Sequence, residues 1–191
     1  MSLLDMRLIK DRVQMCEAPI ERLELLYYED KMDLGHFYFL SDQYYIDFPD
    51  PQLMQNHEAV GGISHDRPCF FAFKDCSTEL YWMIPASSQV EKYQRYYETK
   101  IKKYGKCDTI AFGEVLGRKK AFLIQNMCPI TPEYIKNEYI ANNTLTPVRV
   151  NGVFEAELLS KAKKVLALQR KGFNLIFPDV LKIEKELLSK P

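Results

Sequence analysis

Two spacings of hydrophobic residues recur along the chain, and each predicts one kind of secondary structure. Residues 3–28 repeat apolar positions at helical spacing on both sides of Pro19, which predicts two short helices. Residues 36–40 predict a short strand, and residues 41–48 predict a capped helical turn that ends at Pro49. The prolines and polar residues that follow, as far as Asn56, predict a loop.

The middle of the chain predicts two hairpins. Apolar runs at 70–74 and 80–85 flank the polar segment 74–79, which is typical of two antiparallel strands joined by a turn. Residues 109–116 and 121–125 repeat this arrangement around a basic turn at 117–120. Between the hairpins, the charged segment 89–104 predicts a helix with Val90, Tyr93, Tyr97, Ile101 and Tyr104 on one face, and Gly105 follows as its C-cap.

The last third of the chain predicts mainly helices. Thr131-Pro132 predicts the start of a helix over 131–140, and residues 146–150 predict a short strand. Asn151 caps a predicted helix over 154–171, and a last helix is expected over 178–188. Together these elements predict an α+β fold, a curved and mostly antiparallel sheet with helices on its flanks. We expect one compact domain over residues 36–191 and an appended helical arm over residues 1–35.

Composition excludes several classes of protein. The 191 residues are 47% hydrophobic and 27% charged, which is typical of a globular protein and not of a disordered chain or a disulfide scaffold. The five cysteines and three histidines lack the spacing of a zinc site, so no metal or cofactor is expected. The scattered cysteines and the charged N-terminus indicate a cytoplasmic protein. Phosphate-binding glycine loops and the GxSxG motif are absent.

Charge is distributed unevenly although the net charge is zero. Residues 1–60 contain five basic and twelve acidic side chains, whereas residues 92–120 contain nine basic and three acidic ones. A basic face interleaved with tyrosines is typical of RNA-binding surfaces. A solvated helix face and packed tyrosines explain the same pattern without RNA. The candidates for RNA binding are Tyr93, Arg95, Lys100, Lys103, Arg118, Lys119 and Lys120.

Chemistry is expected at one end of the first hairpin. His65 and Arg67 precede its first strand, and Ser87 and Ser88 end its second, so the hairpin brings them together. An arginine fork and two hydroxyls suit a phosphodiester, and Lys92 lies one helical turn further on. On spacing alone, the more ordinary interpretation of Ser87 and Ser88 is an N-cap of the helix that follows. A triad of Ser88, His65 and Asp66 is disfavoured because neighbouring His and Asp residues rarely have its geometry.

Several short motifs, in their order, resemble the toxins of type III toxin–antitoxin systems, the ToxN, AbiQ, CptN and TenpN group. They cover roughly residues 36–150, and the CptN or TenpN branch is the most similar. The motifs are His36-Phe-Tyr-Phe-Leu-Ser-Asp-Gln-Tyr-Tyr-Ile-Asp-Phe48, His65-Asp-Arg-Pro68, Leu80-Tyr-Trp-Met-Ile-Pro-Ala-Ser-Ser88 and Gln125-Asn-Met-Cys-Pro-Ile-Thr-Pro-Glu-Tyr134.

This resemblance implies a MazF-like sheet and a metal-independent endoribonuclease. It implies cleavage of mRNA that leaves a 2′,3′-cyclic phosphate and a 5′-hydroxyl. It further implies a repetitive pseudoknotted RNA antitoxin that the toxin processes and that bridges protomers in a closed complex active in phage defence. By position, the family's catalytic residues correspond to Arg67, Ser87, Ser88 and Lys92, and its N-terminal tyrosine corresponds to Tyr44 or Tyr45.

Two features depart from the family's pattern. The N-terminal arm has no counterpart in it, and Arg67 stands where ToxN has a lysine. Because a guanidinium keeps its proton, Arg67 is expected to stabilise the phosphorane, which leaves His65 as a candidate acid or base. A non-catalytic RNA-binding protein and a protein-interaction adaptor are the alternative hypotheses.

Overall fold

A computed structural model describes residues 32–60 and 63–190, with the side chains of residues 57–65 left out. The two helices predicted within residues 3–28 lie outside the described residues, as does nearly all of the predicted arm. The described strands are β1 (Phe37–Leu40), β2 (His57–Val60), β3 (Ile63–His65), β4 (Pro68–Lys74), β5 (Tyr81–Ser87), β6 (Ala111–Val115), β7 (Arg118–Phe122), β8 (Cys128–Ile130) and β9 (Ile135–Glu138).

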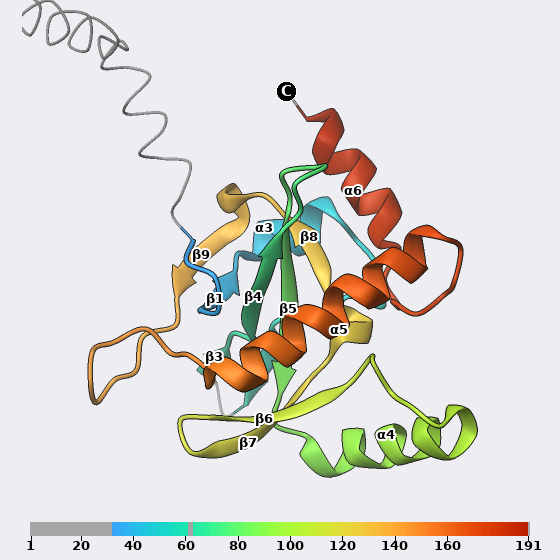
Figure 1. Ribbon diagram of the computed structural model, residues 1–191. Helices are drawn as coiled ribbons and strands as arrows, with labels where there is room; N and C mark the ends of the chain where they lie inside the picture. The colour runs from blue at the N-terminus through green and yellow to red at the C-terminus, as the bar shows by residue number, and fades with distance from the viewer. Residues whose placement is uncertain (1–31, 61–62, 191) are drawn as a thin grey trace, which may run out of the picture. The chain divides into compact units, whose positions relative to one another are not determined.

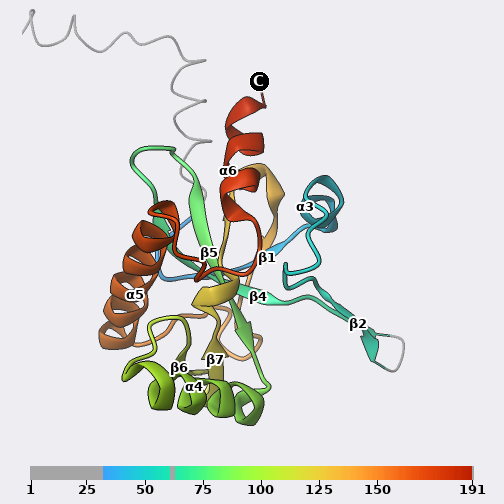
Figure 2. The same ribbon diagram turned by 90° about the vertical axis from the view of Figure 1, so that its right-hand side faces the viewer.

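An antiparallel sheet forms the centre of the described part of the chain. Its strands run in the order β6-β7-β5-β4-β1-β9, and β8 pairs with β5 beside this path. Strand β5 pairs with β8 near its start and with β7 at its end. β2 and β3 form a separate two-stranded hairpin that projects from the sheet (Figure 2). The predicted α+β class and antiparallel sheet are confirmed.

The two faces of the sheet are covered by different helices. Helix α5 (Gly152–Arg170) packs its buried residues against Phe70, Trp82 and Phe122 on one face. Helices α3 (Asp42–Asp47) and α6 (Val180–Ser189) belong to the core on the other face. Figures 1 and 2 show α5 and α3 on opposite sides of the strands. No helix among the described residues has both the length and the apolar composition required to span a bilayer.

Helix α4 (Val90–Tyr104) lies beside the β6–β7 hairpin (Figure 1). Tyr93 is buried against Ile110 and Leu123, with Tyr97 and Ile101 packed around this small core. Tyr104, in contrast, is 63% exposed. The predicted C-cap is confirmed, because Gly105 has a φ of 72° and donates its N–H to the carbonyl of Ile101. The predicted cap of α5 is confirmed too, since Asn151 Oδ1 accepts the N–H of Phe154 at 2.9 Å.

Three predictions about local structure are wrong. Residues 131–140 form a 3-10 turn, Pro132–Tyr134, followed by strand β9. The proline did start a turn, but pairing with β1 overrides the local helix signal. The predicted strand at 146–150 consists of isolated bridges to Ile140 and His36. The predicted basic turn at 117–120 is a two-residue turn at Leu116-Gly117, where φ is 50° and 70°, so its basic residues lie on β7.

Candidate active site

The candidate site lies where β4 begins and β5 ends. Cys69 pairs with Pro85 in the antiparallel register, which brings Arg67 and Ser87 to neighbouring positions beyond that pair. The guanidinium of Arg67 donates from Nη1 to the carbonyl of Ala86 at 3.3 Å. The hairpin therefore brings together two residues that are distant in sequence, as the sequence predicts.

Arg67 is held by the loop that precedes β2. Its Nε donates to the carbonyl of Gln55 at 3.3 Å, and its backbone N–H donates to Asn56 Oδ1 at 3.2 Å. Asn56 in turn donates from Nδ2 to Asp42 Oδ1 at 2.8 Å. The Arg67 side chain is only 6% exposed. Because a guanidinium stays protonated even when buried, the site contains a fixed positive charge just beneath the surface.

Tyr45 lies next to this charge. Its hydroxyl donates to the carbonyl of Met54 at 3.3 Å. Burial raises the pKa of Tyr45 strongly, with smaller contributions from the Cys69 and Cys128 thiols, while the charge of Arg67 acts in the opposite direction. Tyr44 is fully buried, and its hydroxyl donates to the carbonyl of Pro129 at 2.9 Å. Of these two tyrosines, Tyr45 is therefore the one near the candidate site.

The two serines have different environments. Ser87 is buried, and its Oγ accepts the N–H of Gln89 at 3.2 Å. Gln89, without a side-chain capping bond, occupies the N-cap position of α4, so the reading of Ser88 as the helix cap is wrong. Ser88 is exposed. At the end of β5, the Ser87 hydroxyl is therefore buried in the turn and the Ser88 hydroxyl is at the surface. Both follow Ala86, whose carbonyl accepts the hydrogen bond from Arg67.

The basic residues fall into exposed and buried groups. Lys92 and Arg95 are exposed on the first turns of α4, and Lys103 is exposed near its end. Lys100 is half-buried, and its ammonium donates at 2.7 Å to both Thr109 Oγ1 and Gln125 Oε1. Burial lowers the pKa of Lys100. Its contacts tie α4 to the β6–β7 region, which differs from the solvent-facing position expected for an RNA contact.

The remaining predicted residues are distributed as follows. Tyr93 is 7% exposed, so its ring belongs to the small core beneath α4. Arg118 and Lys119 are exposed on β7, where Lys119 lies over the ring of Phe112 at 5.3 Å. The backbone of His65 pairs with His57, but its side chain lies outside the described side chains. Asp66 forms an ion pair with Lys136 at 2.7 Å.

Asn56 is the residue that sequence reasoning missed. It links Arg67 to Asp42, although it sits in a loop that the sequence marks only as irregular. No local pattern identifies such a bridge, because its partners are separated by 11 and 14 residues along the chain. Among the side chains described, no cluster of His, Cys, Asp and Glu has the arrangement required to hold a metal ion.

Comparison with known proteins gives a match in structure only. Neither a known protein family nor a curated protein matches the sequence. The fold is similar to that of AbiQ, a lactococcal anti-phage endoribonuclease belonging to the type III toxin–antitoxin system. The TM-score is 0.59 at 12% sequence identity, over 81% of this chain and 96% of the AbiQ chain. At this identity the similarity establishes a shared α+β fold.

Proposed function

We propose that this protein is an RNA-cleaving toxin of a type III toxin–antitoxin system. The observation that supports it most is the AbiQ-like fold, combined with the contact of Arg67 with β5 beside Ser87. Two of the positions that the family resemblance assigns to catalysis, Arg67 and Ser87, lie at neighbouring positions where β4 begins and β5 ends. The similarity to AbiQ alone does not extend to activity, so the chemistry rests on the residues at this site.

The proposed reaction is a transesterification within RNA. The substrate's 2′-oxygen bonds to the adjacent phosphorus as it loses its proton, and the bond from phosphorus to the 5′-oxygen breaks as that oxygen gains a proton. The products are a 2′,3′-cyclic phosphate and a 5′-hydroxyl. Because the nucleophile belongs to the substrate, the reaction needs no metal-bound water.

Each residue contributes differently because of its exposure. Ser88 and Lys92 are exposed, so they contact the scissile phosphate directly and balance its growing negative charge. Arg67 stabilises the same charge from beneath the surface. Ser87 holds the turn through its bond with Gln89 and thereby sets the position of Ser88. Proton transfer is assigned to His65, because burial raises the pKa of Tyr45 and its hydroxyl is bound to the carbonyl of Met54.

The proposal includes the partners that the family resemblance implies. The substrate is mRNA, and the inhibitor is a small RNA antitoxin of pseudoknot repeats that the enzyme processes. The toxin and this RNA form a closed assembly of several protomers, and the biological setting is defence against phage in the cytoplasm. The exposed cations Lys92, Arg95 and Lys103 on α4 are the proposed contacts for the antitoxin backbone.

Replacing Ser88 by alanine tests the catalytic assignment with little risk to the fold, because the side chain is exposed. We expect Ser88→Ala to slow single-turnover RNA cleavage about 10²-fold, as expected for loss of a transition-state hydrogen bond. Affinity for RNA, measured by fluorescence anisotropy, should change less than about twofold, since one neutral contact is lost.

The matched control is Ser160→Ala, on the exposed face of α5 and away from the hairpin end. This variant should cleave at the wild-type rate. Wild-type cleavage by Ser88→Ala would contradict the assignment. RNA binding without cleavage by the unmodified protein would instead support the non-catalytic alternative, and salt-insensitive failure to bind any RNA would support the adaptor.

A further inference from the structure

A cavity lies behind the candidate site, on the opposite face of the sheet. Its volume is about 450 Å³, within the range of about 300–1,000 Å³ that is usual for small-molecule sites. Pro68 and Ala86 line it, and they are the chain neighbours of Arg67 and Ser87. Because successive side chains of a strand point to opposite faces, the cavity and the candidate site share the same two strand ends.

The floor of the cavity is apolar. Phe37 and Val115 line it together with Pro68 and Ala86. Phe37 is fully buried and contacts the ring of Phe122, with 6.0 Å between the ring centroids. This floor is continuous with the main core beneath α5, so its position is fixed by packing. Phe37 backs this floor from the core, and the apolar surface that a nucleobase can touch comes from Pro68 and from Leu116, which also lines the cavity and is 52% exposed.

Two cations line the same cavity. Arg118 and Lys120 alternate with Lys119 along β7, which places their side chains on the face that also carries Phe122. Burial, followed by the charge of Arg118, lowers the pKa of Lys120. Among the side chains that the structure describes, no acidic group forms an ion pair with either cation. Two adjacent positive charges without a protein counterion favour a phosphate group.

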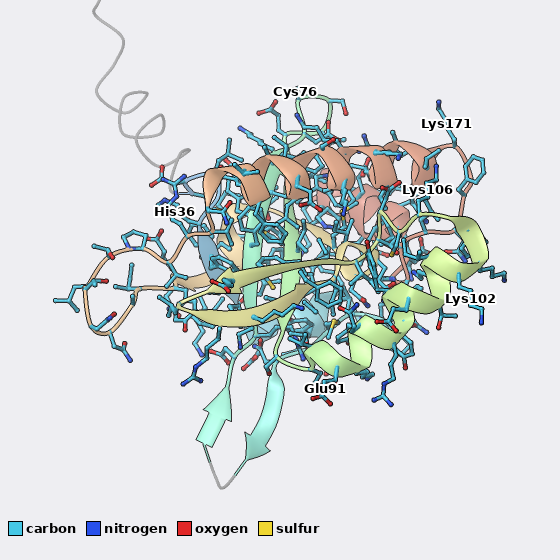
Figure 3. All side chains as sticks on the ribbon, turned by 60° about the horizontal axis from the view of Figure 1, so that its bottom comes forward. His36, Cys76, Glu91, Lys102, Lys106 and Lys171 are labelled. Carbon is cyan, nitrogen blue, oxygen red and sulfur yellow. The ribbon has the colours of Figure 1, made fainter. Side chains whose placement is uncertain are left out.

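The remaining wall is polar and aromatic. Tyr139, Asn142 and Asn143 come from the segment that follows β9, which projects on the same side as the β6–β7 turn (Figures 1 and 3). The ring of Tyr139 is half-buried, and its centroid lies 5.2 Å from that of Phe39. Both asparagines are exposed. An asparagine amide offers a donor and an acceptor side by side, which matches the edge of a base.

We propose that this cavity binds one nucleotide of the RNA substrate next to the scissile phosphate, with its base on the apolar floor and its phosphate on Arg118 and Lys120. Asn142 and Asn143 read the base and so set the sequence preference of cleavage. The inference rests on the proposed function, because it specifies which nucleotide of the RNA substrate binds beside the candidate site. The nucleotide is placed next to the cut because the cavity residues Pro68 and Ala86 are chain neighbours of Arg67 and Ser87 in the candidate site.

The test uses the full-length protein and RNA with randomised nucleotides on both sides of the cut, with the products sequenced. The wild type should prefer one base at a flanking position by about tenfold, the discrimination expected of paired amide contacts. The variant with Asn142→Ala and Asn143→Ala should lose that preference and keep the preferences at other positions. Asn174→Ala, another exposed asparagine, is the control and should match the wild type.

Charge is tested separately by binding. Arg118→Ala with Lys120→Ala should reduce the slope of log affinity against log salt by about 0.7–1, since the two cations share one phosphate and each neutralised phosphate contributes about that much. Lys171→Ala, at the far end of α5 in Figure 3, should leave the slope unchanged. Wild-type sequence preferences that survive in the double asparagine variant, or no preference in the wild type, would overturn the proposal.

Failure of the proposed RNA cleavage can be distinguished from failure of the cavity proposal. If the protein cuts no RNA, the proposed chemistry is wrong, and the cavity is then tested by equilibrium binding of short single-stranded oligomers of each of the four ribonucleotides. Discrimination among the oligomers by the wild type, lost in the double asparagine variant, would support the cavity on its own. Equal binding of all four oligomers by both proteins would overturn it.

Discussion

Replacing Arg67 by alanine should slow RNA cleavage about 10²–10³-fold and also weaken the fold. The cation beneath the phosphate is lost, and removing such a preorganised charge or donor costs about 10²–10³ in rate. The carbonyls of Gln55 and Ala86 lose the hydrogen bonds that Arg67 gives them, at about 1–3 kcal/mol for each carbonyl left unsatisfied. Single-turnover kinetics measure the first effect, and urea unfolding measures the second.

Arg67→Lys separates the two effects. A lysine keeps the positive charge, but its compact ammonium cannot reproduce the planar fork that contacts two carbonyls. We therefore expect this variant to fold, to cleave RNA more slowly than the wild type and to cleave it faster than Arg67→Ala. If Arg67→Ala folds and cleaves at the wild-type rate, Arg67 has no part in the reaction, whereas a wild-type rate in Arg67→Lys alone would show that the charge is enough and the planar fork is not needed.

Gly113→Ala should destabilise the protein by about 1–3 kcal/mol, the usual cost of overpacking a core. A Cβ at this position of β6 would lie 2.2 Å from Cε1 of Phe154. The ring of Phe154 is 93% buried and packs edge-on against Phe122, with 5.0 Å between the ring centroids. To make room, Phe154 must move in a part of the core where α5 meets the sheet.

Gly152→Ala is the matched control, because no other atom lies within 4 Å of the Cβ it would add. Gly152 begins helix α5, where alanine is the better helix former, so this variant should be as stable as the wild type or slightly more stable. Urea unfolding of both variants makes the comparison. Equal stability of Gly113→Ala and the wild type would contradict the described packing of α5 on β6.

The elements that the sequence predicts correctly are those with a strong local signal. The β4–β5 hairpin follows from two apolar runs and a polar turn, and α4 follows from helical spacing ended by Gly105. Asn151 predicts the start of α5 because its side chain accepts the N–H of Phe154 in the first turn of that helix. In each case, residues close together in the sequence determine the element.

The elements that the sequence does not predict depend on partners far along the chain. β9 is a strand because β1 lies beside it, with Tyr38 opposite Glu138, and the local pattern around Pro132 predicts a helix instead. β8 is three residues long and exists only as a partner of β5. Pairing between such distant segments leaves no periodicity in the sequence.

The candidate site shows the same division. The meeting of Arg67 with the end of β5 could be predicted, because a hairpin fixes its own register. The burial of Arg67 and its link through Asn56 to Asp42 could not be predicted, because they depend on the loop at residues 49–56 lying beside Arg67. The packing of Tyr44 and the contacts of Lys100 likewise depend on tertiary neighbours.

The most direct test of the central claim is cleavage of an RNA that carries a single 2′-deoxynucleotide at the cut. The purified protein is incubated with this RNA and with its all-ribose counterpart in EDTA, and the products are separated on a denaturing gel. We predict that the all-ribose RNA is cut to a 2′,3′-cyclic phosphate and a 5′-hydroxyl, and that the deoxy-substituted RNA stays intact. Cleavage of the deoxy-substituted RNA at the same position would contradict attack by the 2′-hydroxyl.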